Sequence, residues 1–208
     1  YGSVYYRLAE QGIMLNVAGG NFGAASQGNT SGWGLPYASD PDSSTVAQPS
    51  TYTASLSVAS VDNANGWGPS AYKASSFSSW GVAPNLTLKP EIAAPGGYIW
   101  SALPGGTYGY SSGTSMATPY LAGMAADIKQ RVESDPGFAY MTEAEKTGVV
   151  YNLLMGTAKP LVDNEGGRGA YYSPRKIGSG LANAVAASSA TVFPTVVEAP
   201  DETRPKAD

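Results

Sequence analysis

The sequence predicts an α/β fold in which a parallel sheet is flanked by helices. Residues 5–11 read as the end of a helix, which one glycine separates from a mostly apolar run of strand length at 13–18. A helix that passes through one glycine into a buried strand is typical of an αβ unit. A strand pattern at 54–61 then precedes an Ala-rich apolar run at 116–132 and a second helical pattern at 142–154. This alternation of helices and strands favours a parallel sheet.

The composition excludes several classes of function. The chain of 208 residues has a formal net charge of −4, which provides no basic surface for a nucleic-acid partner. No apolar run approaches the length of a membrane span. The sequence has no Cys, which rules out disulfides, thiolate metal sites and a thiol nucleophile within it.

The strand at 13–18 is followed by Gly19 and Gly20, which allow the backbone to turn sharply and to approach a ligand closely. Asn21 then stands at the carboxyl end of the strand, where open α/β sheets place their sites. Its amide group can donate a hydrogen bond to an oxyanion. The alternative is a turn Asn whose side chain bonds its own backbone.

The middle of the chain alternates loops with short strands. Residues 24–52 are rich in Ser, Gly, Asn, Pro and Asp and are expected to form a long loop. The strand at 54–61 leads to a turn-rich segment at 63–70. The next buried strand ends at 92–96, and its small residues permit a helix to pack closely against it.

A hairpin is predicted between this strand and the Ala-rich helix. Residues 98–103 read as a strand, the turn is Pro-Gly-Gly at 104–106, and residues 108–111 return. Tyr108 and Tyr110 could stack on sugars, although aromatic residues at strand edges more often belong to a core or a rim.

The stretch from Gly113 to Pro119 (GTSMATP) reads as a tight turn that feeds a buried helix, with Ser115 in or near its first turn. A helix start carries unpaired N–H groups and a partial positive charge. A Ser at this position therefore lies beside ready-made donors for a developing oxyanion. The alternative is that Thr114 or Ser115 serves only as the N-cap.

Beyond this helix, Thr142 and Glu145 match a capping box for a helix that runs to about residue 154. Residues 160–172 are expected to form a polar loop and residues 179–188 a last short helix. From about residue 191 the chain becomes extended, charged and Pro-bearing, as a linker or the start of a following domain would be.

The GTSMATP string resembles the nucleophile motif of the subtilisin-like serine proteases, the subtilases. Other segments resemble further motifs of that family, in the family's order: 17–23 (VAGGNFG), 76–81 (SFSSWG), 89–96 (KPEIAAPG) and 178–184 (GSGLANA). The resemblance covers about residues 1–190. It implies the subtilisin-like fold and a serine endopeptidase in which Ser115 is the nucleophile and Asn21 belongs to the oxyanion hole. Ala18, Gly19 and Gly20 would line the pocket for the residue before the scissile bond.

The segment at 172–178 (YSPRKIG) is similar to one in the cell-envelope proteinases of Gram-positive bacteria, the lactocepin-like branch. This resemblance implies a polypeptide substrate and an extracellular or cell-wall location. It also implies a protease-associated insertion point near 63–70 and a β-domain after about residue 191. Calcium is a common stabiliser in the family, and Asp40 and Asp42 could help to hold such an ion. Two nearby Asp residues in a loop are, however, usually only solvated or capping.

The chain contains no His. A Ser hydroxyl is a weak nucleophile without a general base, and in the triad that base is a His oriented by an Asp. In subtilisin-like enzymes the Asp and the His precede the Ser along the chain. Residues 1–190 are therefore expected to be the C-terminal part of a peptidase domain, inactive without an upstream Asp/His segment. The alternative is a catalytically inactive surface or adhesion module derived from a subtilase.

Overall fold

The computed structural model describes residues 2–23, 44–63, 72–81, 87–163 and 169–195. Its main sheet contains β1 (Asn16–Ala18), β2 (Leu56–Asn63), β3 (Tyr72–Ala74) and β4 (Ile92–Gly97). The long strand β2 is central and runs parallel to both β1 and β4. The predicted parallel sheet is thus confirmed, with β3 added antiparallel to the end of β2.

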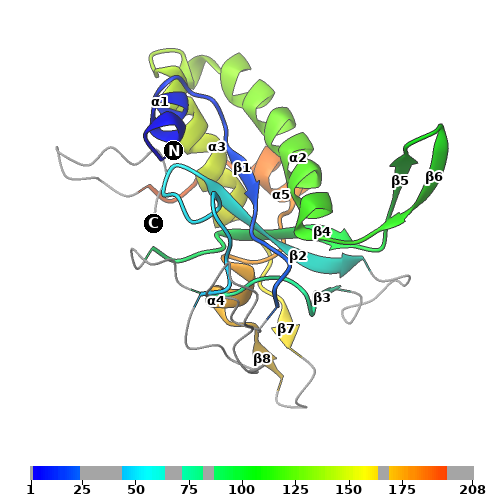
Figure 1. The fold of residues 1–208 in the computed structure, drawn as a ribbon. Coiled ribbons are helices and arrows are strands. Elements are labelled where there is room, and N and C mark those ends of the chain that lie inside the picture. Colours follow the sequence, from blue (N-terminus) through cyan, green and yellow to red (C-terminus); the bar gives the residue numbers. More distant parts are fainter. Residues whose placement is uncertain (1, 24–43, 64–71, 82–86, 164–168, 196–208) are drawn as a thin grey trace.

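Three helices cover one face of the sheet: α1 (Gly2–Glu10), α2 (Thr114–Ser134) and α3 (Glu143–Gly156) (Figure 1). Helix α2 buries one stripe of apolar side chains at intervals of three and four residues: Ala117, Leu121, Ala125, Ile128 and Val132. This spacing places all five on one side of a helix, where they meet the buried residues of β2, β4 and α3. The core therefore fixes the orientation of α2 over the sheet.

Gly96 in β4 allows α2 to approach the sheet closely. A Cβ atom at this position would lie 2.6 Å from the Gly113 carbonyl oxygen and 2.9 Å from the Ala117 Cβ. Real Cβ contacts are not that short, so only glycine fits between β4 and the first turn of α2. This agrees with the expectation that the small residues at 92–96 permit close packing.

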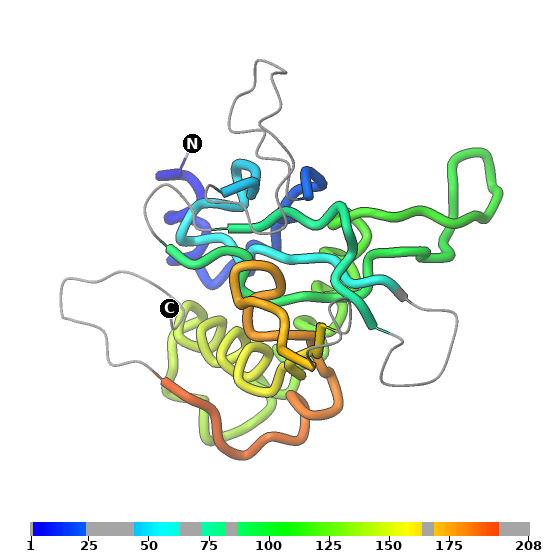
Figure 2. Tube along the Cα trace, turned by 90° about the horizontal axis from the view of Figure 1, so that it is seen from below, coloured from blue at the N-terminus to red at the C-terminus, as the bar shows by residue number. Residues whose placement is uncertain are grey.

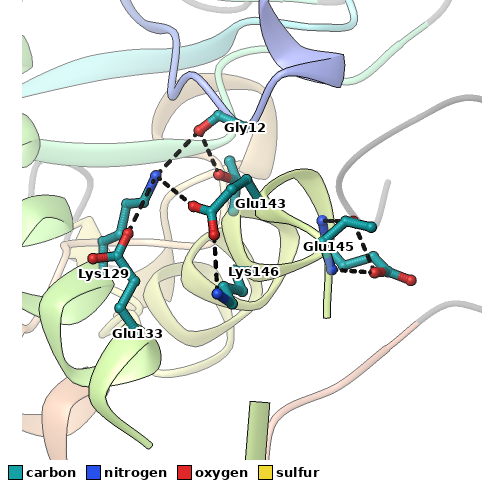
Figure 3. Close-up of polar contacts among 8 residues, drawn as sticks. Gly12, Lys129, Glu133, Glu143, Glu145 and Lys146 are labelled. Carbon is teal, nitrogen blue, oxygen red and sulfur yellow. Dashed lines mark hydrogen bonds and ion pairs between the residues drawn. The ribbon is translucent and has the colours of Figure 1, made fainter. Parts of the chain in front are cut away.

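The turn between α1 and β1 is anchored to α2 and α3 (Figure 3). Gly12, with φ of 74°, ends α1, and its carbonyl oxygen accepts hydrogen bonds from Lys129 Nζ at 3.3 Å and Thr147 Oγ1 at 2.9 Å. Lys129 also lies 3.6 Å from the Glu143 carboxylate. A hydrogen bond from Lys146 lowers the pKa of Glu143. These contacts hold the end of α1 and thereby the start of the strand that leads to Asn21.

The first elements differ in extent from their predictions. Helix α1 covers Gly2–Glu10 and ends one residue before the predicted 11, and β1 covers only Asn16–Ala18 rather than 13–18. Strand β1 starts later than predicted because the N–H of Ile13 donates to the Leu8 carbonyl. This bond closes the end of the helix, so Ile13 does not pair in the sheet. Strand β2 begins and ends two residues later than the predicted 54–61.

The capping box of α3 is confirmed. Thr142 Oγ1 accepts a hydrogen bond from the Glu145 N–H at 3.3 Å, and Glu145 Oε2 accepts one from the Thr142 N–H at 2.7 Å. The hydrogen bonds that the Thr142 N–H and hydroxyl donate to its carboxylate lower the pKa of Glu145. A short 3₁₀ helix, η1 (Pro136–Phe138), joins α2 to this cap.

The C-terminal predictions need correction. The expected polar loop at 160–172 contains the paired strands β7 (Val162–Asp163) and β8 (Ala170–Tyr171), and α4 (Pro174–Ile177) follows it. The last helix, α5 (Ala184–Ser189), starts later than the expected residue 179. Leu181 is held in extended form by bridges to Ala93 and Lys159, so the helix can begin only after Asn183, its N-cap. Figure 2 shows α4 and β8 on the face of the sheet opposite α2.

The predicted hairpin is confirmed as β5 (Ile99–Leu103) and β6 (Thr107–Ser111), an antiparallel pair. Gly105 and Gly106 turn the chain between them with φ of 82° and 74°. The pair, called the arm below, projects away from the main sheet and the helices (Figure 1).

Candidate active site

Ser115 lies in the first turn of α2, as its sequence context predicts. The N-cap is Gly113, whose N–H donates to the Gly96 carbonyl at 2.8 Å, and no side chain caps the helix. The alternative that Thr114 or Ser115 serves as the N-cap is therefore wrong. Ser115 is exposed, and an N–H in the first turn has no partner one turn earlier within its own helix. Both its hydroxyl and its N–H can face a bound molecule.

Asn21 reaches the same end of the sheet through the two glycines after β1. The Gly19 N–H donates to the Val58 carbonyl at 3.0 Å, which continues the pairing of β1 with β2. Gly20 then adopts φ of 113°, and a Cβ there would lie 2.8 Å from Ser79 Oγ. The backbone can turn at this point only because Gly20 has no side chain.

Thr114 joins Asn21 to the start of α2. Its N–H and its hydroxyl both donate to Asn21 Oδ1, each at 2.9 Å, and the Gly20 N–H donates to the same hydroxyl at 3.2 Å. The Thr114 side chain is buried. A backbone N–H can only donate, so this contact fixes which end of the Asn21 amide faces Thr114.

The amide nitrogen of Asn21 is consequently the end left to donate to a ligand. It lies beside the helix start, since a Cβ at Gly113 would be 3.3 Å from Asn21 Nδ2. The structure thus brings Asn21 next to the residue that precedes Ser115. The sequence reasoning missed the role of Thr114, although a hydroxyl residue directly before the predicted nucleophile was a usable indication.

Ala18, Gly19 and Gly20 lie directly before Asn21 at the carboxyl end of β1. Gly19 is buried, and a Cβ there would lie 3.1 Å from the Val58 carbonyl oxygen. Because these three residues have a small side chain or none, the backbone of this turn lies close to the start of α2. Their role as a substrate pocket remains a prediction.

A cavity lies away from this site. It has a volume of about 620 Å³, is mainly apolar, and lies among α3, α4, β8 and the segment that enters β4. None of Ala18, Gly19, Gly20, Asn21 and Ser115 lines it. This cavity is therefore separate from the candidate site.

The described residues contain neither a cluster of metal ligands nor a membrane-spanning helix. Among them, no three Asp or Glu side chains are grouped as a metal site would require. Asp40 and Asp42, the proposed calcium residues, lie outside the described residues. Within the described ranges, no helix has the length and apolar character needed to cross a membrane.

Comparisons with known proteins find similar sequences and a similar structure. The model of the subtilase family matches residues 3–180. The chain is similar to a C5a peptidase of Streptococcus pyogenes, with 38% identity over 126 residues, or 61% of this chain. It is also similar to a PII-type proteinase of Lactococcus lactis subsp. cremoris, with 39% identity over 123 residues, or 57% of this chain. The matched regions amount to only 10% and 6% of those relatives.

A solved structure shares the fold. The prenylagaramide maturation protease PagA aligns with a TM-score of 0.58 and 25% identity, covering 87% of this chain and 51% of that protein. The family match spans most of the described fold, including the turn at Asn21 and the helix start at Ser115. The chain belongs to the subtilase family.

Proposed function

We propose that the chain is part of a serine endopeptidase that forms an acyl-enzyme on Ser115. The Asn21 amide and the Ser115 N–H would hold the oxyanion of the tetrahedral intermediate. The observation that carries this proposal is the contact of Thr114 with Asn21 Oδ1, which orients the free amide nitrogen beside the start of α2. Oriented donors of this kind stabilise charge that develops in the transition state.

The nucleophile needs a base that this chain does not contain. A His from an upstream segment would take the Ser115 proton as the hydroxyl oxygen attacks the peptide carbonyl, and an Asp would orient that His. The same His would then return the proton to the leaving amine, and water would hydrolyse the acyl-enzyme. Because the chain has no His, it should be inactive alone.

The substrate would be a polypeptide. Ala18, Gly19 and Gly20 precede the oxyanion donor directly, so they would line the pocket for the residue before the scissile bond. Their small size leaves room for a sizeable side chain in that pocket.

The domain organisation and the location follow the same resemblance. Residues 1–190 would form the C-terminal part of the peptidase domain, and 191–208 a linker or the start of a β-domain. The proposed insertion point near 63–70 lies largely outside the described residues. The similarity to two proteinases of Gram-positive bacteria supports an extracellular or cell-surface location.

The alternative is an inactive surface or adhesion module, which the lack of His in this chain favours. A casein hydrolysis assay separates the two. The isolated chain, the chain supplied with its upstream segment, and the Ser115→Ala variant of the latter are compared. We expect hydrolysis only from the second sample. Absence of hydrolysis in all three would favour the inactive module.

A further inference from the structure

One buried serine holds the backbone on both sides of Asn21. Ser79 is only 1% exposed and lies in the segment that follows β3. Its N–H donates to the Gly20 carbonyl at 3.0 Å, and its hydroxyl oxygen accepts from the Phe22 N–H at 3.1 Å. Gly20 and Phe22 are the two neighbours of Asn21 in the chain. Ser79 therefore fixes the backbone immediately before and immediately after the proposed oxyanion donor.

Further bonds fix the two ends of this turn. The Gly19 carbonyl accepts from the Ala47 N–H at 3.0 Å, and the Gly23 N–H donates to the Phe77 carbonyl at 2.7 Å. Both are backbone bonds, so a change of the Ser79 side chain does not remove them. The Ser79 hydroxyl acts between these two ends, where Asn21 lies.

Ser79 and Thr114 act on different parts of Asn21. Thr114 donates to the side-chain oxygen, Oδ1, and so fixes the rotation of the amide. Ser79 bonds to the flanking backbone and so fixes the point from which the side chain projects. A donor stabilises an oxyanion only when it is held at the right distance and angle, so both constraints contribute.

The packing around Ser79 explains how its hydroxyl acts on the turn. Gly20 has φ of 113°, and a Cβ there would lie 2.8 Å from Ser79 Oγ. The hydroxyl is thus packed against the glycine while it accepts from the Phe22 N–H. Because Phe22 is 40% exposed, an N–H released from Ser79 can turn toward water, and the adjoining Asn21 would shift with it.

We propose that Ser79 is a positioning residue that sets the place of the Asn21 amide in the oxyanion hole. The inference rests on the proposed function, in which that amide stabilises the tetrahedral intermediate. Ser79 is buried too deeply to touch a substrate, so it acts through Asn21. Its effect should therefore appear in the transition state and not in substrate binding.

The test compares two adjacent serines in the protein with its upstream segment. Ser78 is also fully buried, and its Oγ accepts from the Ser60 N–H of β2 at 2.9 Å. Ser78→Ala therefore removes a bond of the same kind in the same segment. We expect Ser79→Ala to lower kcat for a peptide anilide by about two- to tenfold with KM within about twofold. Ser78→Ala should keep the wild-type kcat.

A double-mutant cycle separates positioning from a general structural effect. Adding Ser79→Ala to Asn21→Ala should change kcat by less than about twofold, because the donor that Ser79 positions is already gone. The affinity for a peptide boronate, which mimics the tetrahedral intermediate, should fall in Ser79→Ala by the same factor as kcat/KM. In case the alanine variant does not fold, Ser79→Cys fills the same space with a weaker acceptor and should give an intermediate kcat.

An unchanged kcat in Ser79→Ala, an equal loss in Ser78→Ala, or full additivity with Asn21→Ala would overturn the proposal. A wild-type kcat in Asn21→Ala itself would instead refute the proposed oxyanion hole. Failure of Ser115 in the wild type to react with a fluorophosphonate would refute the proposed function as a whole.

Discussion

Removal of the Thr114 hydroxyl is expected to slow catalysis without weakening substrate binding. In the Thr114→Val variant the shape is retained, but the hydroxyl bonds to Asn21 Oδ1 at 2.9 Å and to the Gly20 N–H at 3.2 Å are lost. The bond from the Thr114 N–H to Asn21 remains. The amide is therefore held less firmly, not released.

The size of the effect follows from these bonds. Complete loss of the equivalent donor in subtilisin costs about 10²–10³ in kcat, a measured value for that enzyme. Loss of one of the two bonds that orient Asn21 should cost about 0.5–1.5 kcal/mol, or up to about tenfold in kcat. The unpaired Gly20 N–H in this half-buried turn should lower the free energy of unfolding by about 1 kcal/mol, the low end of the range for a buried group.

The assay measures kcat and KM for a peptide anilide in the protein with its upstream segment, together with urea unfolding. Thr118→Val is the matched control, since it removes a hydroxyl of α2 that donates to a backbone carbonyl, that of Thr114, at 2.8 Å. It lies one turn further along α2 and does not touch Asn21. A Thr114→Val variant with wild-type kcat, or an equal loss of kcat in Thr118→Val, would refute the reasoning.

Three further predictions concern the scaffold. Lys89→Met should lower the free energy of unfolding by about 3–5 kcal/mol in urea titrations, because Lys89 is fully buried and its loss would leave the Glu91 carboxylate, which also accepts from the Ser57 N–H, without this neutralising ammonium. Adding Glu91→Gln should recover part of this loss, and no recovery would contradict the ion-pair account. Gly96→Ala should displace the start of α2 and reduce both stability and Ser115 labelling, because its Cβ would lie 2.6 Å from the Gly113 carbonyl oxygen. Burial raises the pKa of Tyr151, so the folded state disfavours the phenolate and stability should fall as the pH rises above about 10, the ordinary value. Tyr151→Phe should flatten this alkaline decline, and an unchanged pH profile would contradict the prediction.

Much of the fold could be predicted because the local patterns agree with the tertiary packing. The glycine stop after α1, the capping box at Thr142 and the Pro-Gly-Gly turn of the arm each act over a few residues. The apolar residues of α2 recur with the period of a helix, and the side of the helix that they form packs on the sheet. Such features need no knowledge of distant segments.

Other features depend on contacts between distant parts of the chain. The late start of α5 results from the pairing of Leu181 with Ala93 and Lys159, which no local pattern indicates. The candidate site also depends on a contact between distant residues. Asn21 and Ser115 could each be proposed from their own motifs, but the Thr114 contact joins positions 93 residues apart and appears only in the folded chain.

The central claim is that Ser115 is the nucleophile of an acyl-transfer site. The most direct measurement treats the protein carrying its upstream segment with a fluorophosphonate and locates the adduct by mass spectrometry. A single adduct on Ser115 that disappears when the upstream His is replaced by Ala is the predicted result. An adduct on another Ser, or equal labelling of Ser115 without the upstream segment, would contradict the account.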